Sequence, residues 1–310
     1  MKKATLFTLA AATLVFGVSA YAEEVTVGYA SAALSDTFSN HLAYAWEDYI
    51  DEFPGYNVTV VDGDWDPSNE INVMNDLFAQ GVDALICQPM PGCESGGMQF
   101  YQAGKPVVFV NIIPTITDDL KDMEFTYVGC SDYDIGVAWA EYFKEALPEN
   151  GTCVIIENPL GQVSTQDRYD GFVDTITEAR PDVQILDAQS SNADTANSMA
   201  LMEDWLQRFG SDGIDCVISQ SAASTAGVIE VLKANDLIGK VMVGSVDLPE
   251  DSGVDWLLDG YTTVDVVQDY ATISRTAMEV VQKQLNGEET EYEYWIPLMI
   301  ATAENAEEFR

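Results

Sequence analysis

Polar residues of one chemical kind recur along this chain, each placed directly after a short apolar run. Amides and carboxylates dominate the set, aromatic residues lie beside them, and lysine is almost absent. Amides donate and accept hydrogen bonds and carboxylates accept them, which suits a small molecule with several hydroxyl groups. A phosphate site would need a glycine-rich loop and cations, and neither a G-x-x-x-x-G-K-[ST] nor a G-x-G-x-x-G pattern occurs.

Alternating strands and helices must hold these residues in place. Short β-branched or apolar runs, which are typical of buried parallel strands, predict strands at 25–30, 57–61, 82–87, 106–110 and 125–128, and again at 152–156, 183–186, 214–219, 241–244 and 263–267. Between them, apolar residues at helical spacing run from Phe38 to Phe53 before Pro54, and a second helix runs from Asp66-Pro67 to Gly81. Further helices are expected at 135–147, 166–179, 195–209, 223–234 and 270–285.

Two successive strand–helix sets of this size predict an α/β protein with two doubly wound lobes. In an open parallel sheet the ligand lies beyond the carboxyl ends of the strands. The polar residues that follow the predicted strands are therefore the candidate site.

The net charge of the chain limits the classes of partner that it can bind. The 310 residues carry 52 Asp+Glu against 13 Lys+Arg, a formal charge of −39, with 47% hydrophobic residues. The apolar share fits a globular protein, while the negative charge argues against binding nucleic acid or anionic lipid. The acids are expected to coat the outer surface, and we take this as an adaptation to saline or alkaline surroundings, where salt screens the repulsion.

Metal and thiol chemistry have little support in the sequence. His41 is the single histidine and is expected on a helix, in a polar-face or capping role, so no multi-histidine metal site is possible. The cysteine spacings match no zinc pattern, and we expect neither a metal nor a cofactor. Cys87, Cys153 and Cys216 lie in apolar runs and are expected to be buried, whereas Cys93 and Cys130 follow strands and are the candidates for a disulfide.

The first 22 residues have the features of a cleavable signal peptide. Lys2 and Lys3 precede an apolar run over 4–19, and Ala20-Tyr21-Ala22 offers small residues before a cut after Ala22. The run is shorter than the ~20 apolar residues that a membrane anchor needs. Cleavage would leave 52 acids and 13 − 2 = 11 bases, a charge of −41. We therefore expect a protein that works outside the cytoplasm.

An ordered set of short pieces resembles the ribose-binding-protein-like family of periplasmic sugar receptors of ABC transporters, along nearly the whole mature chain. In chain order the pieces are Leu34-Ser35-Asp36-Thr37-Phe38, Asp66-Pro67, Gln80-Gly81-Val82-Asp83-Ala84, Gln88-Pro89, Gly104-Lys105-Pro106-Val107-Val108, Val128-Gly129-Cys130-Ser131-Asp132, Gly136, Arg168-Tyr169-Asp170-Gly171-Phe172, Gly244-Ser245-Val246-Asp247, Asp259-Gly260, Gln268 and Leu285-Asn286-Gly287.

The resemblance implies two Rossmann-like lobes joined by a three-crossover hinge, the type I periplasmic binding protein fold. It implies an N-terminal lobe over 23–131 plus 269–296 and a C-terminal lobe over 132–268 plus 297–310. The resemblance also implies the site residues. Together with Asn111, at the end of the fourth strand, the candidate ligand-binding residues are Asp36, Phe38, Gln166, Arg168, Ser221, Asp247 and Gln268. Trp65 and Asp132 are possible additions.

This chain departs from the family pattern at three places. Asn111-Ile112 stands where ribose and glucose receptors have an Asp-Arg pair, and around Asn192-Ala193 a second aromatic wall is absent; Trp65 or Tyr133 could replace it. Gln166 also stands where an Arg is common in pentose receptors. The ligand is therefore expected to be a neutral molecule other than ribose, such as another monosaccharide, a deoxysugar or a polyol.

The function that the resemblance implies is capture of a neutral monosaccharide or polyol by hinge closure, by a monomer that delivers it to an inner-membrane ABC permease. A receptor for the autoinducer-2 signal or a sugar sensor coupled to a chemoreceptor is the alternative within the binding class. A secreted glycosidase, with two carboxylates about 5–10 Å apart, is a remote alternative. A sugar-responsive repressor is excluded, since a signal peptide occupies the place of its DNA-binding segment.

Overall fold

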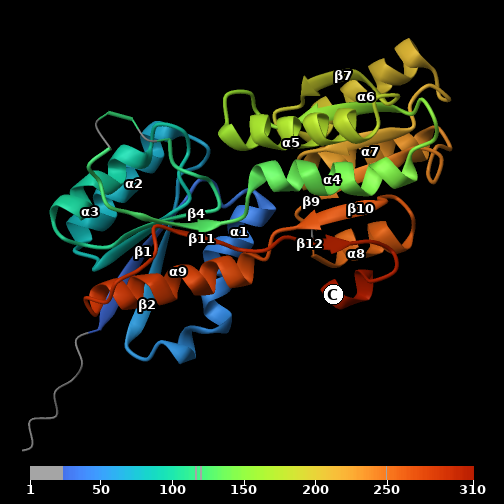
Figure 1. Ribbon diagram of the computed structural model, residues 1–310. Helices are drawn as coiled ribbons and strands as arrows, with labels where there is room; N and C mark the ends of the chain where they lie inside the picture. The colour runs from blue at the N-terminus through green and yellow to red at the C-terminus, as the bar shows by residue number, and fades with distance from the viewer. Residues whose placement is uncertain (1–23, 116, 119–120, 249) are drawn as a thin grey trace, which may run out of the picture.

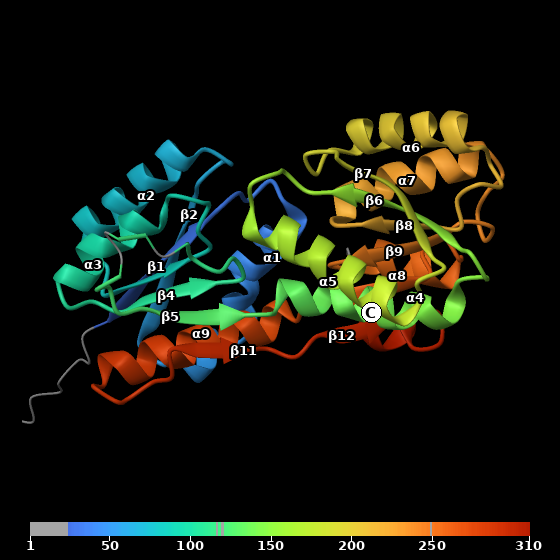
Figure 2. The ribbon, with the colours of Figure 1, turned by 45° about the horizontal axis from the view of Figure 1, so that its top comes forward.

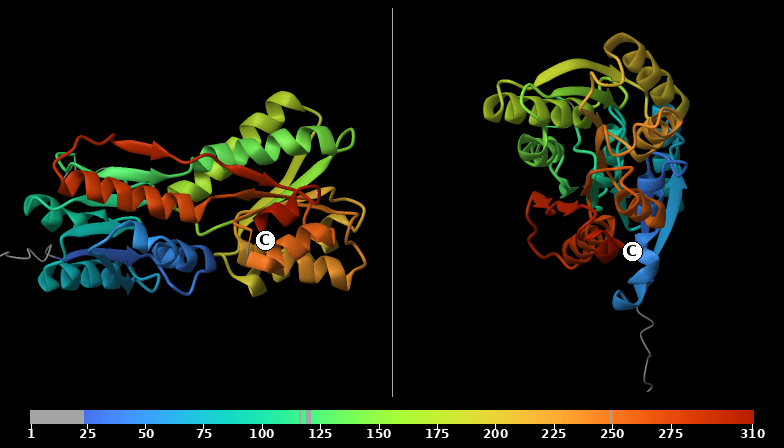
Figure 3. Two further views of the ribbon diagram at one scale, coloured as in Figure 1. Left: turned by 90° about the horizontal axis from the view of Figure 1, so that it is seen from below. Right: turned by 90° about the vertical axis from the view of Figure 1, so that its right-hand side faces the viewer.

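A computed structural model describes residues 24–115, 117–118, 121–248 and 250–310. The predicted signal peptide lies outside the described residues. The described chain forms two α/β lobes side by side, elongated in one view and compact when seen from the end (Figures 1 and 3). The predicted fold class of two doubly wound lobes is confirmed.

The N-terminal lobe is built on a six-stranded parallel sheet of order β11-β5-β4-β3-β1-β2. Its strands are β1 (Val25–Ser31), β2 (Tyr56–Asp62), β3 (Ala84–Cys87), β4 (Val107–Val110), β5 (Thr126–Gly129) and β11 (Glu293–Trp295). All four residues of β3, β4 and β5 are buried. Continuous apolar runs therefore form the centre of the sheet, as expected for strands covered on both faces.

The C-terminal lobe repeats this order as β12-β10-β9-β8-β6-β7. Its strands are β6 (Thr152–Glu157), β7 (Gln184–Ser190), β8 (Cys216–Ser219), β9 (Met242–Val246), β10 (Val264–Val267) and the antiparallel edge strand β12 (Met299–Ala301). Each strand of one lobe thus has a counterpart at the same place in the other.

Helices cover both faces of each sheet. In the N-terminal lobe, α1 (Thr37–Tyr44) and α9 (Tyr270–Leu285) pack on one face, and α2 (Pro67–Gln80) and α3 (Met98–Gln102) on the other. In the C-terminal lobe, α4 (Asp132–Ala146) and α5 (Val163–Ala179) lie opposite α6 (Thr195–Phe209) and α7 (Ala222–Ala234), while α8 (Glu250–Leu258) packs near the chain end. As predicted, α2 is capped by Asp66 and ended by Gly81 at φ 86°.

The chain passes between the lobes three times. It leaves the N-terminal lobe between β5 and α4, returns between β10 and α9, and leaves again between β11 and β12. The late helix α9 therefore lies against the first lobe (Figure 1). Figure 2 shows β4 and β5 pointing toward the C-terminal lobe, so their carboxyl ends face the space between the lobes.

One predicted helix is wrong in its length. The helix expected from Phe38 to Phe53 ends at Tyr44, and two 3₁₀ turns, Ala45–Asp48 and Ile50–Glu52, follow. A 3₁₀ helix repeats every three residues. Trp46, Tyr49 and Phe53 nevertheless pack against the N-terminal core, as the apolar pattern predicts.

The cysteines correct another prediction. All five are buried, and all five are free thiols. Cys93 packs in the α2–α3 core and donates to the carbonyl of Pro67, whereas Cys130 packs in the α1–α9 core on the other face of the sheet. The expected Cys93–Cys130 disulfide is therefore wrong, because the sheet separates the two sulfurs. No helix in the described ranges is long and apolar enough to span a membrane.

Candidate ligand-binding site between the lobes

Six residues with an amide or carboxylate side chain occupy the first position after a strand, at the ends where the lobes face each other. Two follow strands of the N-terminal lobe and four follow strands of the C-terminal lobe; they are Gln88 after β3, Asn111 after β4, Asn158 after β6, Gln220 after β8, Asp247 after β9 and Gln268 after β10. The equal placement in the two sheets makes Gln88 the counterpart of Gln220, and Asn111 the counterpart of Asp247.

A chain of hydrogen bonds connects four of these residues across the hinge. Gln88 Nε2 donates to Asn111 Oδ1 at 2.9 Å, and Asn111 Nδ2 donates to Gln268 Oε1 at 3.1 Å. Gln268 Nε2 in turn donates to Asp247 Oδ1 at 2.7 Å. We call these four residues the hinge network. It joins the ends of β3 and β4 in one lobe to the end of β9 in the other.

The backbone of two residues of this network is held in the left-handed region. Asn111 has φ 60° and Asp247 has φ 64°, and neither is glycine. Asn and Asp tolerate this conformation better than most residues, yet it still carries a cost. Tyr127 OH, which donates to the Asn111 carbonyl at 2.8 Å, fixes the first of these turns. Strained backbone that the surroundings hold in place is typical of a functional site.

A second group of contacts surrounds Arg168 on α5. Its Nε donates to Asp132 Oδ1 at 2.7 Å and its Nη1 donates to the Gln220 carbonyl at 2.9 Å. Within the described ranges, Arg168 is the one buried lysine or arginine, and Asp132 is buried with it. Burial raises the pKa of Asp132, with Arg168 opposing the rise. Burial acts to lower the pKa of Arg168, but the charges of Asp132 and Asp247 raise it overall.

Asp247 lies close to several charged and polar groups. Burial raises the pKa of its carboxyl to about 7, Arg168 and the Gln268 bond oppose the rise, and Asp265 and Asp36 add to it. The influence of Asp36 places carboxylates of both lobes near the same space. Asp36 itself caps α1, where its Oδ1 accepts from Ser39 N at 2.9 Å and from Ser39 Oγ at 2.8 Å.

Two amides leave a buried oxygen without a partner. Gln88 Oε1 and Asn158 Oδ1 are enclosed and form no hydrogen bond, although Gln88 Nε2 and Asn158 Nδ2 are both bonded. A buried acceptor left unpaired costs about 1–3 kcal/mol. Both oxygens are therefore suited to accept a hydrogen bond from a bound molecule.

The structure brings some of the sequence-predicted residues together and leaves others apart. Asn111, Asp247 and Gln268 form the hinge network, and Arg168 and Asp132 pair beside it. Phe38 is half-buried and meets the Tyr270 ring edge-on, with centroids 6.5 Å apart. His41, which was expected in a polar-face or capping role, lies against the same ring at 5.3 Å.

Three other predicted residues lie outside these contacts. Gln166 is exposed, and its Nε2 donates to Asp170 along the surface of α5. Ser221 caps α7, accepting from Ser224 N at 3.3 Å. Trp65 is 46% exposed in the turn after β2, at φ 51°. Gln88, Asn158 and Gln220 were missed as site residues, although each has the signal of a polar residue directly after a buried strand.

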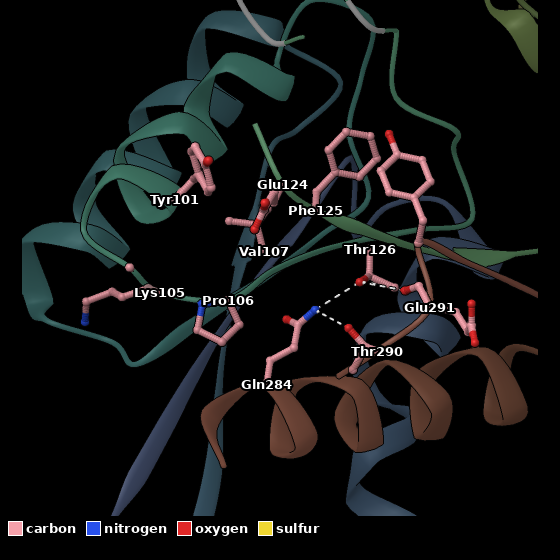
Figure 4. Close-up of a pocket in the computed structure, with 12 residues that line it drawn as sticks. Tyr101, Lys105, Pro106, Val107, Glu124, Phe125, Thr126, Gln284, Thr290 and Glu291 are labelled. Carbon is pink, nitrogen blue, oxygen red and sulfur yellow. Dashed lines mark hydrogen bonds between the residues drawn. The ribbon is translucent and has the colours of Figure 1, made fainter. Parts of the chain in front are cut away.

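A larger cavity among the described residues lies elsewhere. It measures about 370 Å³ and is lined at the amino ends of β4 and β5, by Lys105, Val107, Phe125, Gln284 and Thr290 among others (Figure 4). Gln284 Nε2 bridges Thr126 and Thr290 there, and Lys105 Nζ is bonded to the carbonyls of Gly81 and Val82. Ligands of open parallel sheets bind at the carboxyl ends instead. Among the described residues, no group of three or more His, Cys, Asp or Glu could hold a metal.

Known proteins resemble this chain along most of its length. A rhizopine-binding protein of Rhizobium meliloti, provisionally named as such, is 28% identical over 308 residues, which cover 97% of each chain. A solute-binding protein of Actinobacillus succinogenes with bound D-allose has a TM-score of 0.85 at 19% identity and covers 92% of this chain and 100% of its own. A solute-binding protein of Bacillus halodurans with bound myo-inositol has a TM-score of 0.82 at 23% identity, and the match covers 93% of this chain and 97% of its own.

These structural likenesses show the fold. The assignment of the chain to a family rests on a separate match. A model described as a periplasmic binding protein domain matches residues 27–289, which includes both lobes and the hinge network. The proteins of this family bind solutes in the periplasm for ABC transporters. The chain belongs to the periplasmic binding protein family.

Proposed function

We propose that this protein captures a neutral sugar or polyol between its lobes and delivers it to an ABC permease in the inner membrane. The observation that carries the proposal is the hinge network, in which amides and one carboxylate from both lobes converge. The bound D-allose and myo-inositol of the two structural relatives, and the rhizopine of the sequence relative, support a small polyhydroxy ligand.

The chemistry of the site supports hydroxyl groups as the recognised feature. A hydroxyl donates one hydrogen bond and accepts others. Gln88 Oε1 and Asn158 Oδ1 offer unpaired acceptors, and Asp247 offers a carboxylate oxygen. Of the predicted contacts we retain Asp36, Phe38, Asn111, Arg168, Asp247 and Gln268 as ligand-binding proposals and add Gln88 and Asn158. Gln166, Ser221, Trp65 and Asp132 remain predictions, with Asp132 acting through Arg168.

Ligand binding is coupled to hinge closure in this proposal. A ligand that contacts both lobes binds best when the lobes approach, so it shifts the population toward the closed form. We propose the lobe boundaries given above, a cleavable leader cut after Ala22, and a monomer. The function is binding without chemical change, so the ligand is expected to be released intact.

Titration calorimetry against a panel of monosaccharides and polyols, combined with small-angle scattering, tests this proposal. We expect one group of related polyhydroxy compounds to bind and to reduce the radius of gyration. Mass spectrometry of the released ligand should show it unchanged. Failure of every neutral sugar and polyol to bind, or saturating ligand without compaction, would contradict the proposal.

A further inference from the structure

A second, smaller cavity lies between the lobes. It holds about 10 Å³, roughly the space of one water-sized sphere. We call it the inter-lobe niche. Residues of the two lobes line the niche from opposite sides. The N-terminal lobe contributes Pro91, Glu94, Ile112, Ile113 and Thr115, and the start of α5 contributes Gln162, Val163 and Ser164.

The niche has an apolar wall from each lobe. Ile112 and Ile113 face it from the first lobe and Val163 from the second. Its buried acid, Glu94, is already committed, because Oε2 accepts from Gly92 N at 2.8 Å and Oε1 from Thr115 N at 3.0 Å. These two bonds engage both carboxylate oxygens of Glu94 and hold the loops around the niche.

The niche adjoins the polar site on both lobes. Ile112 follows Asn111 directly, and Asn111 itself follows β4 in the left-handed region, at φ 60°. On α5, Ser164 precedes Arg168 by four residues, which places the two on the same face of the helix. The niche is therefore one residue along the chain from Asn111 and one helical turn from Arg168, two of the proposed ligand contacts.

We propose that the inter-lobe niche receives a methyl-sized apolar end of the ligand, so that the protein prefers a deoxy or O-methyl form of its sugar or polyol. The inference rests on the proposed function and names the substrate class of the same site. Size limits the group to about one methyl. Because residues of both lobes form the niche, the methyl group also stabilises the closed form.

Calorimetry with matched ligand pairs tests the preference. The pairs are L-fucose with L-galactose, D-fucose with D-galactose, L-rhamnose with L-mannose, and 3-O-methyl-D-glucose with D-glucose. In at least one pair the methyl-bearing member should bind about tenfold more tightly, because an apolar pocket favours an added apolar carbon, as in the O-methyl pair, and disfavours an added hydroxyl, as in the three deoxy pairs. If the hydroxyl member binds as tightly or more tightly in every pair that binds, the inference is overturned and the proposed function stands.

Variants of the niche residues show whether these side chains contact the ligand or only the opposite lobe. Ile112→Asn and the near-isosteric Val163→Thr should each reduce the preference severalfold, mainly by weakening the methyl-bearing ligand. Val163 is 39% exposed, so its variant should fold even if the Ile112 variant does not. Leu160→Asn, at a nearby residue 70% exposed and outside the niche, is the control and should leave the preference unchanged. Equal weakening of both members would overturn the inference, and binding of no sugar or polyol at all would overturn the proposed function with it.

Discussion

The side chain of Asn111 donates a hydrogen bond of 3.1 Å to Oε1 of Gln268, joining residues 157 positions apart in the sequence. Asn111 follows β4 of the first lobe, and Gln268 lies where the chain returns from β10 to α9. Gln268 also donates to Asp247 at the end of β9. One amide therefore relates the two lobes through both of its polar atoms.

Removing this amide should weaken ligand binding as well as the fold. Gln268→Ala leaves Asn111 Nδ2 and one oxygen of Asp247 without partners, and each unpaired buried group costs about 1–3 kcal/mol. We expect ligand affinity to fall at least tenfold in calorimetry. Gln284→Ala, which also removes an amide with two bonds but in the distant cavity, is the matched control. Equal losses in the two variants would contradict the assignment of Gln268 to the site.

Ligand affinity should depend on pH through Asp247. Burial raises the pKa of this carboxyl to about 7, against the influence of Arg168 and Gln268, and Asp265 and Asp36 raise it further. Below this value the group is protonated and is a weaker acceptor for ligand hydroxyls. Affinity for a neutral ligand should therefore rise between pH 6 and 8, and Asp247→Asn should bind weakly with a flatter profile. A wild-type affinity that is constant or falls over this range would be inconsistent with the role of Asp247.

The sequence predicted the fold because its strands are continuous apolar runs and its helices carry clear caps. Asp66 and Gly81, for example, begin and end α2 where expected. The edge strands β11 and β12 were not predicted, since each has three residues and most of them are exposed. Such strands have no apolar pattern, and pairing with an existing sheet forms them.

The site was predicted in part, for a related physical reason. A polar residue after a buried strand is visible in the sequence, and this rule finds Asn111, Asp247 and Gln268. The sequence does not show which atoms are already bonded. It cannot show that Asp132 pairs with Arg168, that Gln166 faces solvent, or that the oxygens of Gln88 and Asn158 lack partners. These facts depend on side chains from distant elements.

Glu70 should make the free energy of unfolding depend on pH. It is fully buried on α2 and accepts from Met90 N at 3.1 Å, and burial raises its pKa to about 7 from an ordinary value of 4.5. Between these two values the folded protein holds more protons than the unfolded chain, so stability falls as pH rises through this window. The contribution of Glu70 to the pH dependence of the unfolding free energy amounts to about 3 kcal/mol at most.

Urea unfolding of the wild type and Glu70→Gln at pH 5, 6, 7 and 8 measures this term. Asp247 and Asp265 also have raised pKa values, but both proteins contain them, so their effects cancel in the difference. We expect the wild type to lose stability relative to Glu70→Gln as pH rises. A difference that stays constant across the four pH values would show that Glu70 does not titrate in this range.

The crossing of α4 and α5 should tolerate no added carbon at Gly136. A Cβ there would lie 2.3 Å from the carbonyl oxygen of Arg168 and 2.5 Å from the backbone nitrogen of Phe172. Gly136→Ala must push the helices apart and so strain the 2.7 Å contact between Asp132 and Arg168. We expect a loss of about 1–3 kcal/mol in unfolding free energy together with weaker ligand binding. Ala138→Gly is the control, because it lowers helix propensity nearby without adding an atom. It should lower the free energy of unfolding by about 1 kcal/mol and leave ligand affinity unchanged. A Gly136→Ala protein with wild-type affinity would show that Arg168 does not depend on this close packing.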